Sequence, residues 1–243
     1  MINVYPARRT PEGIGAVMAR AFPTDLLAWP ETDPFVLIDD FHVPPDASFP
    51  EHPHRGFEII TYMVQGGFAH RDSTGLEVAC RSGGVMRITC GRGVTHSEYP
   101  LGDRLTRGLQ LWVNLPRRLK GLSPEAEARE AADVPEHTFA GGRVRVIGGE
   151  GGAVLLHTPI RYVDVQWAGG ATWREELPAD WTGILYVLEG AVSLGDQLVH
   201  RQSVAVVRDE PSVELRAVDP ARAAWIAGPR QHEAIRFYGP FVD

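Results

Sequence analysis

The chain has few cysteines, no long apolar run and no excess of positive charge. Only Cys80 and Cys90 are present among 243 residues, and their spacing lacks the CxxC pattern of a zinc or redox site. We expect both thiols to be reduced and buried rather than joined in a disulfide. With 31 acidic and 24 basic residues, the net charge of −7 gives no global electrostatic reason to bind nucleic acid or an anionic membrane.

The sequence also shows no pattern typical of a membrane-spanning helix or a targeting segment. No apolar run approaches the roughly 20 residues that a helix needs to cross a bilayer. The first nine residues carry charges without a following apolar region, so they do not read as a signal peptide. We therefore expect no membrane partner and a cytoplasmic location.

Helical periodicity is nearly absent, whereas short apolar runs bounded by Gly and Pro recur along the chain. These runs are rich in β-branched and aromatic residues, which predicts strands at 35–38, 59–64, 85–89, 109–113, 144–147, 162–166, 184–188 and 203–207. The best helix candidate is 124–132, with Ser123 as N-cap and Pro124 at the first helical position, although a solvated linker fits it equally. The pattern predicts an all-β protein with sandwich or barrel geometry.

A weak internal repeat divides the chain into two similar halves. The segment YMVQG at 62–66 resembles YVLEG at 186–190, and each reads as a strand ending in a glycine turn. We place the seam within 119–137 and predict two domains, 1–120 and 121–243. On this offset, His52, His54 and Glu58 fall on Glu176, Pro178 and Thr182, so the second half has kept the scaffold and lost the histidines.

Two short segments carry the strongest chemical signal. His52 and His54 are two residues apart, and so are His96 and Glu98. On a strand, residues at this spacing point to the same face. Two such strands facing one another offer three imidazoles and one carboxylate to a single ion, with coordination positions left open for water, substrate or dioxygen. Closed structural zinc sites usually contain cysteine, so this set predicts an open metal centre.

Glu58 competes with Glu98 for the role of carboxylate ligand. It has the same strand parity as the two histidines of the first segment, but Gly56 lies between, where a bulge would change the register. We prefer Glu98 as the ligand and expect Glu58 to orient an imidazole. The remaining histidines are expected to be surface or hydrogen-bonded residues: His42, His70, His137, His157, His200 and His232.

The segments that hold these residues resemble the pirin family, which belongs to the cupin superfamily. The sequence reads FPEHPHRGFE at 49–58 and TCGRGVTHSE at 89–98, and further matches lie at 33–35, 70–73, 108–116 and 238–242. The resemblance implies two tandem cupin (jelly-roll β-barrel) domains. It also implies one mononuclear metal, usually iron, in the N-terminal barrel, with a C-terminal barrel that lacks ligands. The family's ligands fall here on His52, His54, His96 and Glu98.

Several bacterial pirins resemble flavonol dioxygenases, which open quercetin with O2 and release carbon monoxide. The resemblance therefore implies a divalent metal, foremost Fe(II), although Ni, Co, Cu, Mn and Zn also suit such ligands. It implies a flavonol or related phenolic substrate, with Glu98 as catalytic base. Phe57, Met86 and Trp112 are candidate pocket walls, and a core role fits each of them equally. The alternative that stays open is a non-enzymatic iron-binding regulatory protein that acts through a protein partner.

Overall fold

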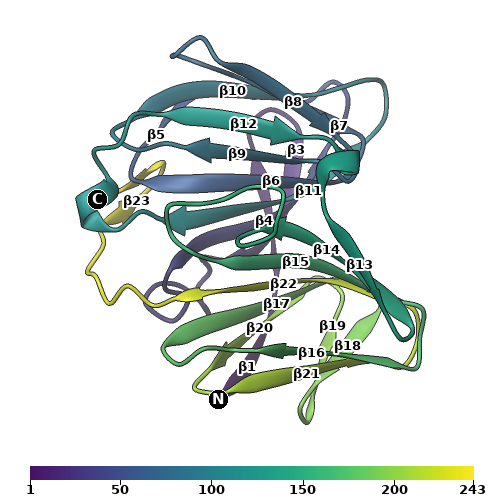
Figure 1. Ribbon diagram of the computed structural model, residues 1–243. Coiled ribbons are helices and arrows are strands. Elements are labelled where there is room, and N and C mark those ends of the chain that lie inside the picture. Colours follow the sequence, from purple (N-terminus) through teal and green to yellow (C-terminus); the bar gives the residue numbers. More distant parts are fainter.

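Four stacked layers of antiparallel strands form the molecule, as the computed structural model of residues 1–243 shows (Figure 1). Two seven-stranded sheets lie in the middle, and a four-stranded sheet lies on the outer side of each. Each seven-stranded sheet and its four-stranded partner enclose one barrel. The prediction of an all-β protein is confirmed.

The first barrel contains the two segments with metal-binding residues. Its four-stranded sheet has the order β5 (Phe49–His54), β10 (Val94–Pro100), β7 (Gly67–Asp72) and β8 (Glu77–Arg81). Its seven-stranded sheet has the order β12 (Glu125–Arg129), β9 (Val85–Thr89), β6 (Phe57–Gln65), β11 (Thr106–Asn114), β4 (Phe35–Val43), β3 (Ala16–Phe22) and β2 (Arg8–Glu12).

The second barrel repeats this arrangement strand for strand. Its four-stranded sheet has the order β16 (Ala171–Glu176), β21 (Ser212–Ala217), β18 (Ala191–Leu194) and β19 (Gln197–His200). Its seven-stranded sheet has the order β1 (Ile2–Pro6), β20 (Ser203–Arg208), β17 (Trp181–Glu189), β22 (Ala221–Pro229), β15 (Arg161–Trp167), β14 (Gly142–Gly148) and β13 (Glu136–Phe139). The weak sequence repeat is therefore a structural repeat, and all eight predicted strands are present.

The helix predicted at 124–132 is wrong, and so is the alternative of a solvated linker. Glu125–Arg129 forms strand β12, which pairs with β9, and only Ala131–Asp133 makes a single 3-10 turn (η2). A second short 3-10 turn, η1, covers Arg117–Leu119. The edge of the first sheet supplies β12 with backbone partners, and this tertiary pairing overrides the local preference for a helix.

The two barrels exchange one strand each. β1 precedes the strands of the first barrel in the chain but pairs with β20 of the second, whereas β12 precedes the second barrel and pairs with β9 of the first. The two exchanged strands occupy equivalent edge positions. The division into domains 1–120 and 121–243 stays a prediction. β1 comes before residue 120 but pairs within the second barrel, and β12 comes after it but pairs within the first.

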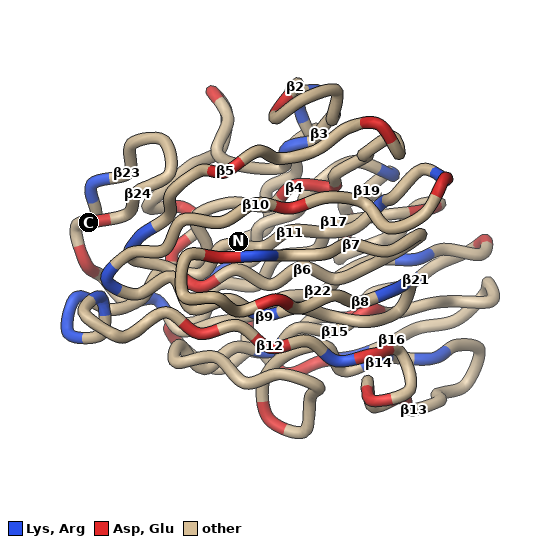
Figure 2. The backbone as a smooth tube through the Cα atoms, turned by 90° about the horizontal axis from the view of Figure 1, so that it is seen from above, with Lys and Arg blue, Asp and Glu red and all other residues tan.

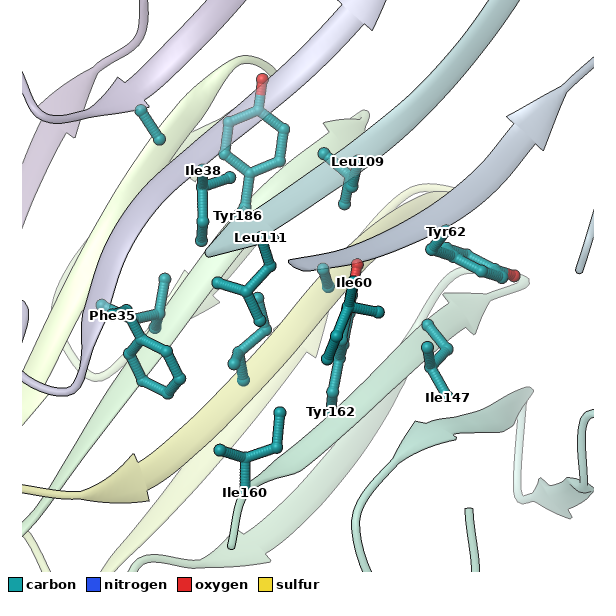
Figure 3. Packing of buried hydrophobic residues seen from close by; sticks show 14 of the residues in the cluster. Phe35, Ile38, Ile60, Tyr62, Leu109, Leu111, Ile147, Ile160, Tyr162 and Tyr186 are labelled. Atoms are coloured by element: carbon teal, nitrogen blue, oxygen red, sulfur yellow. The ribbon is translucent and has the colours of Figure 1, made fainter. Parts of the chain in front are cut away.

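A shared hydrophobic core joins the barrels. It contains 23 buried residues, most of which come from the two seven-stranded sheets, among them Ile60, Leu111, Tyr162 and Tyr186. Figure 3 shows these side chains meeting between strands of the two sheets. Because the core spans the interface, the barrels stabilise one another by burying apolar surface.

Two equivalent polar clusters flank this interface. The Tyr62 hydroxyl donates to Asp164, at 2.8 Å, and Arg222 binds the same carboxylate. In the opposite direction, the Tyr186 hydroxyl donates to Asp40, at 3.3 Å, and Arg107 binds that carboxylate. Each barrel thus sends one tyrosine to a buried ion pair of the other, as a two-fold arrangement requires.

Charged residues of both signs are interspersed along the chain in the view of Figure 2. A strand composed of alternating buried and exposed residues, such as Ser212–Ala217, keeps its charges on the outer face.

No helix in the structure has the length and apolar character needed to span a bilayer.

Candidate metal centre

Strands β5 and β10 lie side by side and bring the predicted histidines together. His96 is directly opposite His52 in the antiparallel pairing, and His54 follows two residues later on β5. The ring nitrogens available for coordination on these three histidines lie within 4.8 Å of one another. The Nε2 atoms of His52 and His96 are only 3.0 Å apart. One ion could therefore bind all three imidazoles.

A bulge in β5 sets the position of the fourth predicted ligand. Between the pairs His96–His52 and Glu98–Phe49 the register shifts, so β5 has one residue more than β10. The irregularity is at 50–51, not at Gly56 as the sequence suggested; at Gly56 β5 has already ended and the backbone has a φ of +90°. Bulges re-aim side chains beside functional sites.

Hydrogen bonds and burial leave the histidine lone pairs free. The Nδ1 atom of His52 donates to the Pro50 carbonyl at 2.7 Å, and Nδ1 of His54 faces the Pro240 carbonyl at 3.3 Å. Carbonyls only accept, so the neutral form of each ring has its lone pair on Nε2. Burial and the neighbouring imidazole of His52 lower the pKa of His54 to about 3. Burial and the nearby imidazoles also lower the pKa of His96, so both rings are neutral, as metal binding requires.

Glu98 has a buried carboxylate oxygen without a hydrogen-bond partner. Its Oε1 atom has none, whereas Oε2 accepts a long contact of 3.4 Å from the Gln110 amide. Burial raises the pKa of Glu98 to about 7. Glu98 also lies within 4.8 Å of His96 and His70, so His96 joins two groups of ligand-type residues. An unpaired buried oxygen beside neutral imidazoles fits a cation, since such a group otherwise stays costly to bury.

Glu58 does not orient a ligand imidazole, and this prediction is wrong. Its buried carboxylate accepts from the Thr89 hydroxyl at 2.8 Å and from the backbone N–H of His157 at 2.9 Å. The Arg87 guanidinium lies 3.6 Å away. β6 begins only after the turn at Gly56, so parity counted from His54 does not carry across to Glu58.

A cavity of about 570 Å³ opens over His52 and His54. Its walls include Phe49, Trp112 and, from the end of the chain, Phe237. A small inner chamber of about 30 Å³ continues it towards the cluster, with the following residues among its lining: Asp39, Phe41, Glu98 and Gln110. The larger space has the size of a site for a small organic molecule, and the inner one is adjacent to the candidate ligands.

The three predicted wall residues have different positions. Trp112 lines both spaces. Phe57 is stacked behind Trp112, with ring centroids 4.2 Å apart and an interplanar angle of 18°. Met86 belongs to a core cluster with Phe41 and Phe68. Only Trp112 therefore contacts the cavity, and the other two support its walls.

The C-terminal tail returns from the second barrel to complete the cavity in the first. Its strands β23 (Phe237–Tyr238) and β24 (Phe241–Val242) form a small hairpin beside β5 and β6 (Figure 1). Arg55 binds the Asp243 side chain through two contacts of 2.7 Å, and the Lys120 ammonium donates to the Val242 carbonyl at 2.8 Å. The site in the first barrel thus depends on a segment of the second half.

Sequence reasoning assigned no role to three residues beside the site: the buried His70 and Asp72, and the half-buried Gln110. His70 was expected among the surface or hydrogen-bonded histidines, and it is buried between His96 and Asp72. Gln110 contacts Glu98 and accepts from the Trp112 indole N–H at 3.0 Å. A signal was present for two of them: His70 and Asp72 share the two-residue spacing that marked the ligand pairs.

The first half of the chain matches the Pirin family model over residues 16–113, and the second matches the model of the pirin C-terminal cupin domain over residues 162–243. The chain belongs to the pirin family. A pirin-like protein of Solanum lycopersicum is 36% identical to this pirin over 97% of the chain and 84% of the relative. Pirin of Mus musculus is 35% identical over the same shares.

A solved structure adds to this likeness. Quercetin 2,3-dioxygenase from Acinetobacter baumannii matches this pirin with a TM-score of 0.90 and 31% identity, covering 99% of this chain and 90% of the other. The two barrels are cupin domains, as the resemblance implied. The pirin also has a cluster of histidine and glutamate residues that could hold a divalent metal.

Proposed function

We propose that this pirin is a metal-dependent dioxygenase that opens quercetin or a related flavonol or phenolic with O2 and releases carbon monoxide. The observation that carries the proposal is a cluster of imidazoles and a Glu98 with an unpaired oxygen, at the base of an open cavity and its inner chamber. The similarity to quercetin 2,3-dioxygenase from Acinetobacter baumannii supports the choice of a flavonol as substrate class.

His52, His54, His96 and Glu98 would hold the metal, for which Fe(II) is our first choice. When bound, it supplies Lewis acidity that favours the deprotonated flavonol, together with the redox capacity to engage dioxygen. Of the three imidazoles, those of His52 and His54 would be oriented by hydrogen bonds from Nδ1 to backbone carbonyls.

Glu98 would act as the base for the 3-hydroxyl of the flavonol. Its Oε1 atom accepts no hydrogen bond within the protein, and it could take this proton once the carboxylate swings away from the ion. Gln110 contacts the other oxygen of the carboxylate and is itself oriented by Trp112. The carboxylate is therefore oriented by its neighbours while one oxygen stays available.

The cavity would separate the two co-substrates. Its outer part, about 570 Å³, is within the range of sites for small organic ligands, and Trp112 and Phe237 offer aromatic surfaces to a flat molecule. The inner chamber of about 30 Å³ exceeds the roughly 10–15 Å³ that one water needs, so it has room for a diatomic molecule.

The test is anaerobic reconstitution with Fe(II), metal analysis, and measurement of quercetin loss and carbon monoxide release. We expect metal-dependent turnover that falls about 10²- to 10⁴-fold in Glu98→Gln, with metal content measured in the same samples. Glu150→Gln, an exposed change of the same type, is the control. A bound metal without carbon monoxide release would reject the dioxygenase and favour the regulatory alternative.

A further inference from the structure

Two buried side chains extend a chain of hydrogen bonds outward from His96. Nδ1 of His96 lies 3.0 Å from Nδ1 of His70, and Nε2 of His70 lies 3.1 Å from Oδ2 of Asp72. The side chains of His70 and Asp72 have no exposed surface. Both residues are on β7, directly opposite Glu98 and His96 on β10. The sheet therefore holds the three groups in a row.

The outer end of this row has a fixed direction. Oδ1 of Asp72 accepts from the N–H and the hydroxyl of Thr74, at 2.8 and 2.6 Å, and from the N–H of Leu76 at 3.3 Å. Oδ2 is left to accept from His70, so the ring hydrogen of His70 is on Nε2. A neutral imidazole has only one ring hydrogen, which makes Nδ1 of His70 an acceptor. His96 must then donate from Nδ1, and its Nε2 has a lone pair.

The inner end has a fixed direction as well. Nδ1 of His52 donates to the Pro50 carbonyl, so its Nε2 also has a lone pair. The Nε2 atoms of His52 and His96 therefore face one another at 3.0 Å without a hydrogen to share. A bound cation removes this mismatch, because both lone pairs then become ligands.

We propose that His70 and Asp72 are positioning residues that hold His96 in the tautomer whose Nε2 lone pair points at the metal. The inference rests on the proposed function, in which His96 is a ligand. It goes further because it assigns a role to two residues outside the ligand set. Of the three histidine ligands, only His96 depends on such a relay, since the other two face backbone carbonyls.

The substitution Asp72→Asn would reverse the relay. The amide oxygen must stay beside the N–H groups of Thr74 and Leu76, so the amide NH2 would point at Nε2 of His70. Without metal, every group in the reversed row would then have a partner, because His96 could donate from Nε2 to His52. With metal, His70 would face two donors and have a single lone pair. In the wild type the unsatisfied hydrogen bond is therefore in the metal-free protein, whereas in Asp72→Asn it is in the metal-bound protein.

The first measurement is Zn(II) affinity of the full chain, determined by competition with a chromophoric chelator. We expect Asp72→Asn to weaken zinc binding about 10- to 100-fold, the usual effect of losing a partner of a metal-bound histidine. The rise in thermal unfolding temperature on zinc addition should shrink in parallel. Asp103→Asn, an exposed change with the same loss of charge, should behave as wild type.

A second variant separates the relay from a general effect of Asp72 on its loop. His70→Asn keeps a hydrogen-bonding group beside His96 but breaks the link to Asp72. In the His70→Asn background, adding Asp72→Asn should change zinc affinity less than twofold. Nitrogen-15 NMR of histidine-labelled protein supplies the tautomers: hydrogen on Nε2 of His70 in the zinc-bound wild type, and on Nδ1 in metal-free Asp72→Asn.

Three results would overturn the relay: wild-type zinc affinity in Asp72→Asn, an equal loss in the His70→Asn background, or unchanged histidine tautomers. Failure of the metal site itself has a different signature. In that case the wild type would bind no zinc, or His96→Ala would bind it as tightly as wild type. The two failures are therefore distinguishable in one set of titrations.

Discussion

The two cupin barrels of this pirin have the same strand order, but the interior of the second is apolar whereas that of the first contains polar, ligand-type residues. In the second barrel, the strands β16 and β21, which are equivalent to β5 and β10, turn Trp173, Val213 and Leu215 inward. These residues belong to one continuous core of 22 buried side chains. In the first barrel the equivalent strands carry His52, His54, His96 and Glu98, and the core separates into two clusters of nine residues.

The difference shows how one fold can serve two purposes. The filled second barrel supplies apolar burial and therefore stability. The first barrel gives up part of this burial for polar groups that are held in place by neighbours. The shared core and the exchanged strands connect the two, so the stable barrel supports the one that is suited to chemistry.

Removing one of the proposed metal ligands from the first barrel should have the largest effect. We expect His96→Ala to abolish stoichiometric metal binding after reconstitution. Only two imidazoles and the Glu98 carboxylate would remain as ligands, and the Gln110 contact that supports Glu98 is long, at 3.4 Å. Metal analysis and circular dichroism would measure binding and folding. His200→Ala, an exposed histidine of the second barrel, is the control. Full metal occupancy in His96→Ala would contradict the ligand assignment.

Opening a void in the second barrel should reverse this pattern. Leu215→Ala removes a fully buried side chain, and we expect it to lower the free energy of unfolding by about 2–5 kcal/mol without changing metal content. Urea unfolding followed by tryptophan fluorescence would measure the loss. Leu198→Ala, on the exposed surface of the same sheet, should cost far less. Similar costs for the two variants would mean that the second interior is not tightly packed.

The smallest effect compares the two polar clusters at the interface. Tyr62→Phe removes a 2.8 Å hydrogen bond to a buried carboxylate and should cost about 1.5 kcal/mol. The equivalent Tyr186→Phe removes a contact of 3.3 Å and should cost less. Thermal and urea unfolding of both variants would rank them. An equal or larger loss for Tyr186→Phe would show that the two clusters do not differ as their geometry indicates.

Local patterns in the sequence predicted those features that depend on neighbours a few residues apart. Apolar runs between turn formers gave the strands, and the two-residue spacing placed His52 with His54 and His96 with Glu98 on common strand faces. Strand parity failed at Glu58, because the chain turns at Gly56 before β6 begins. The helix at 124–132 failed because a distant strand, β9, pairs with this segment.

By itself, the sequence determined that this protein is an all-β pirin whose first half holds the pairs His52–His54 and His96–Glu98, with no histidine pair of this spacing in the second half. Only the tertiary structure decided which groups support those residues: His70 and Asp72 behind His96, Gln110 beside Glu98, and the C-terminal tail over the cavity. The physical reason is range. Side-chain parity along a strand is fixed locally, whereas hydrogen-bond partners and pocket walls come from segments that meet only when the sheets pair and the barrels pack.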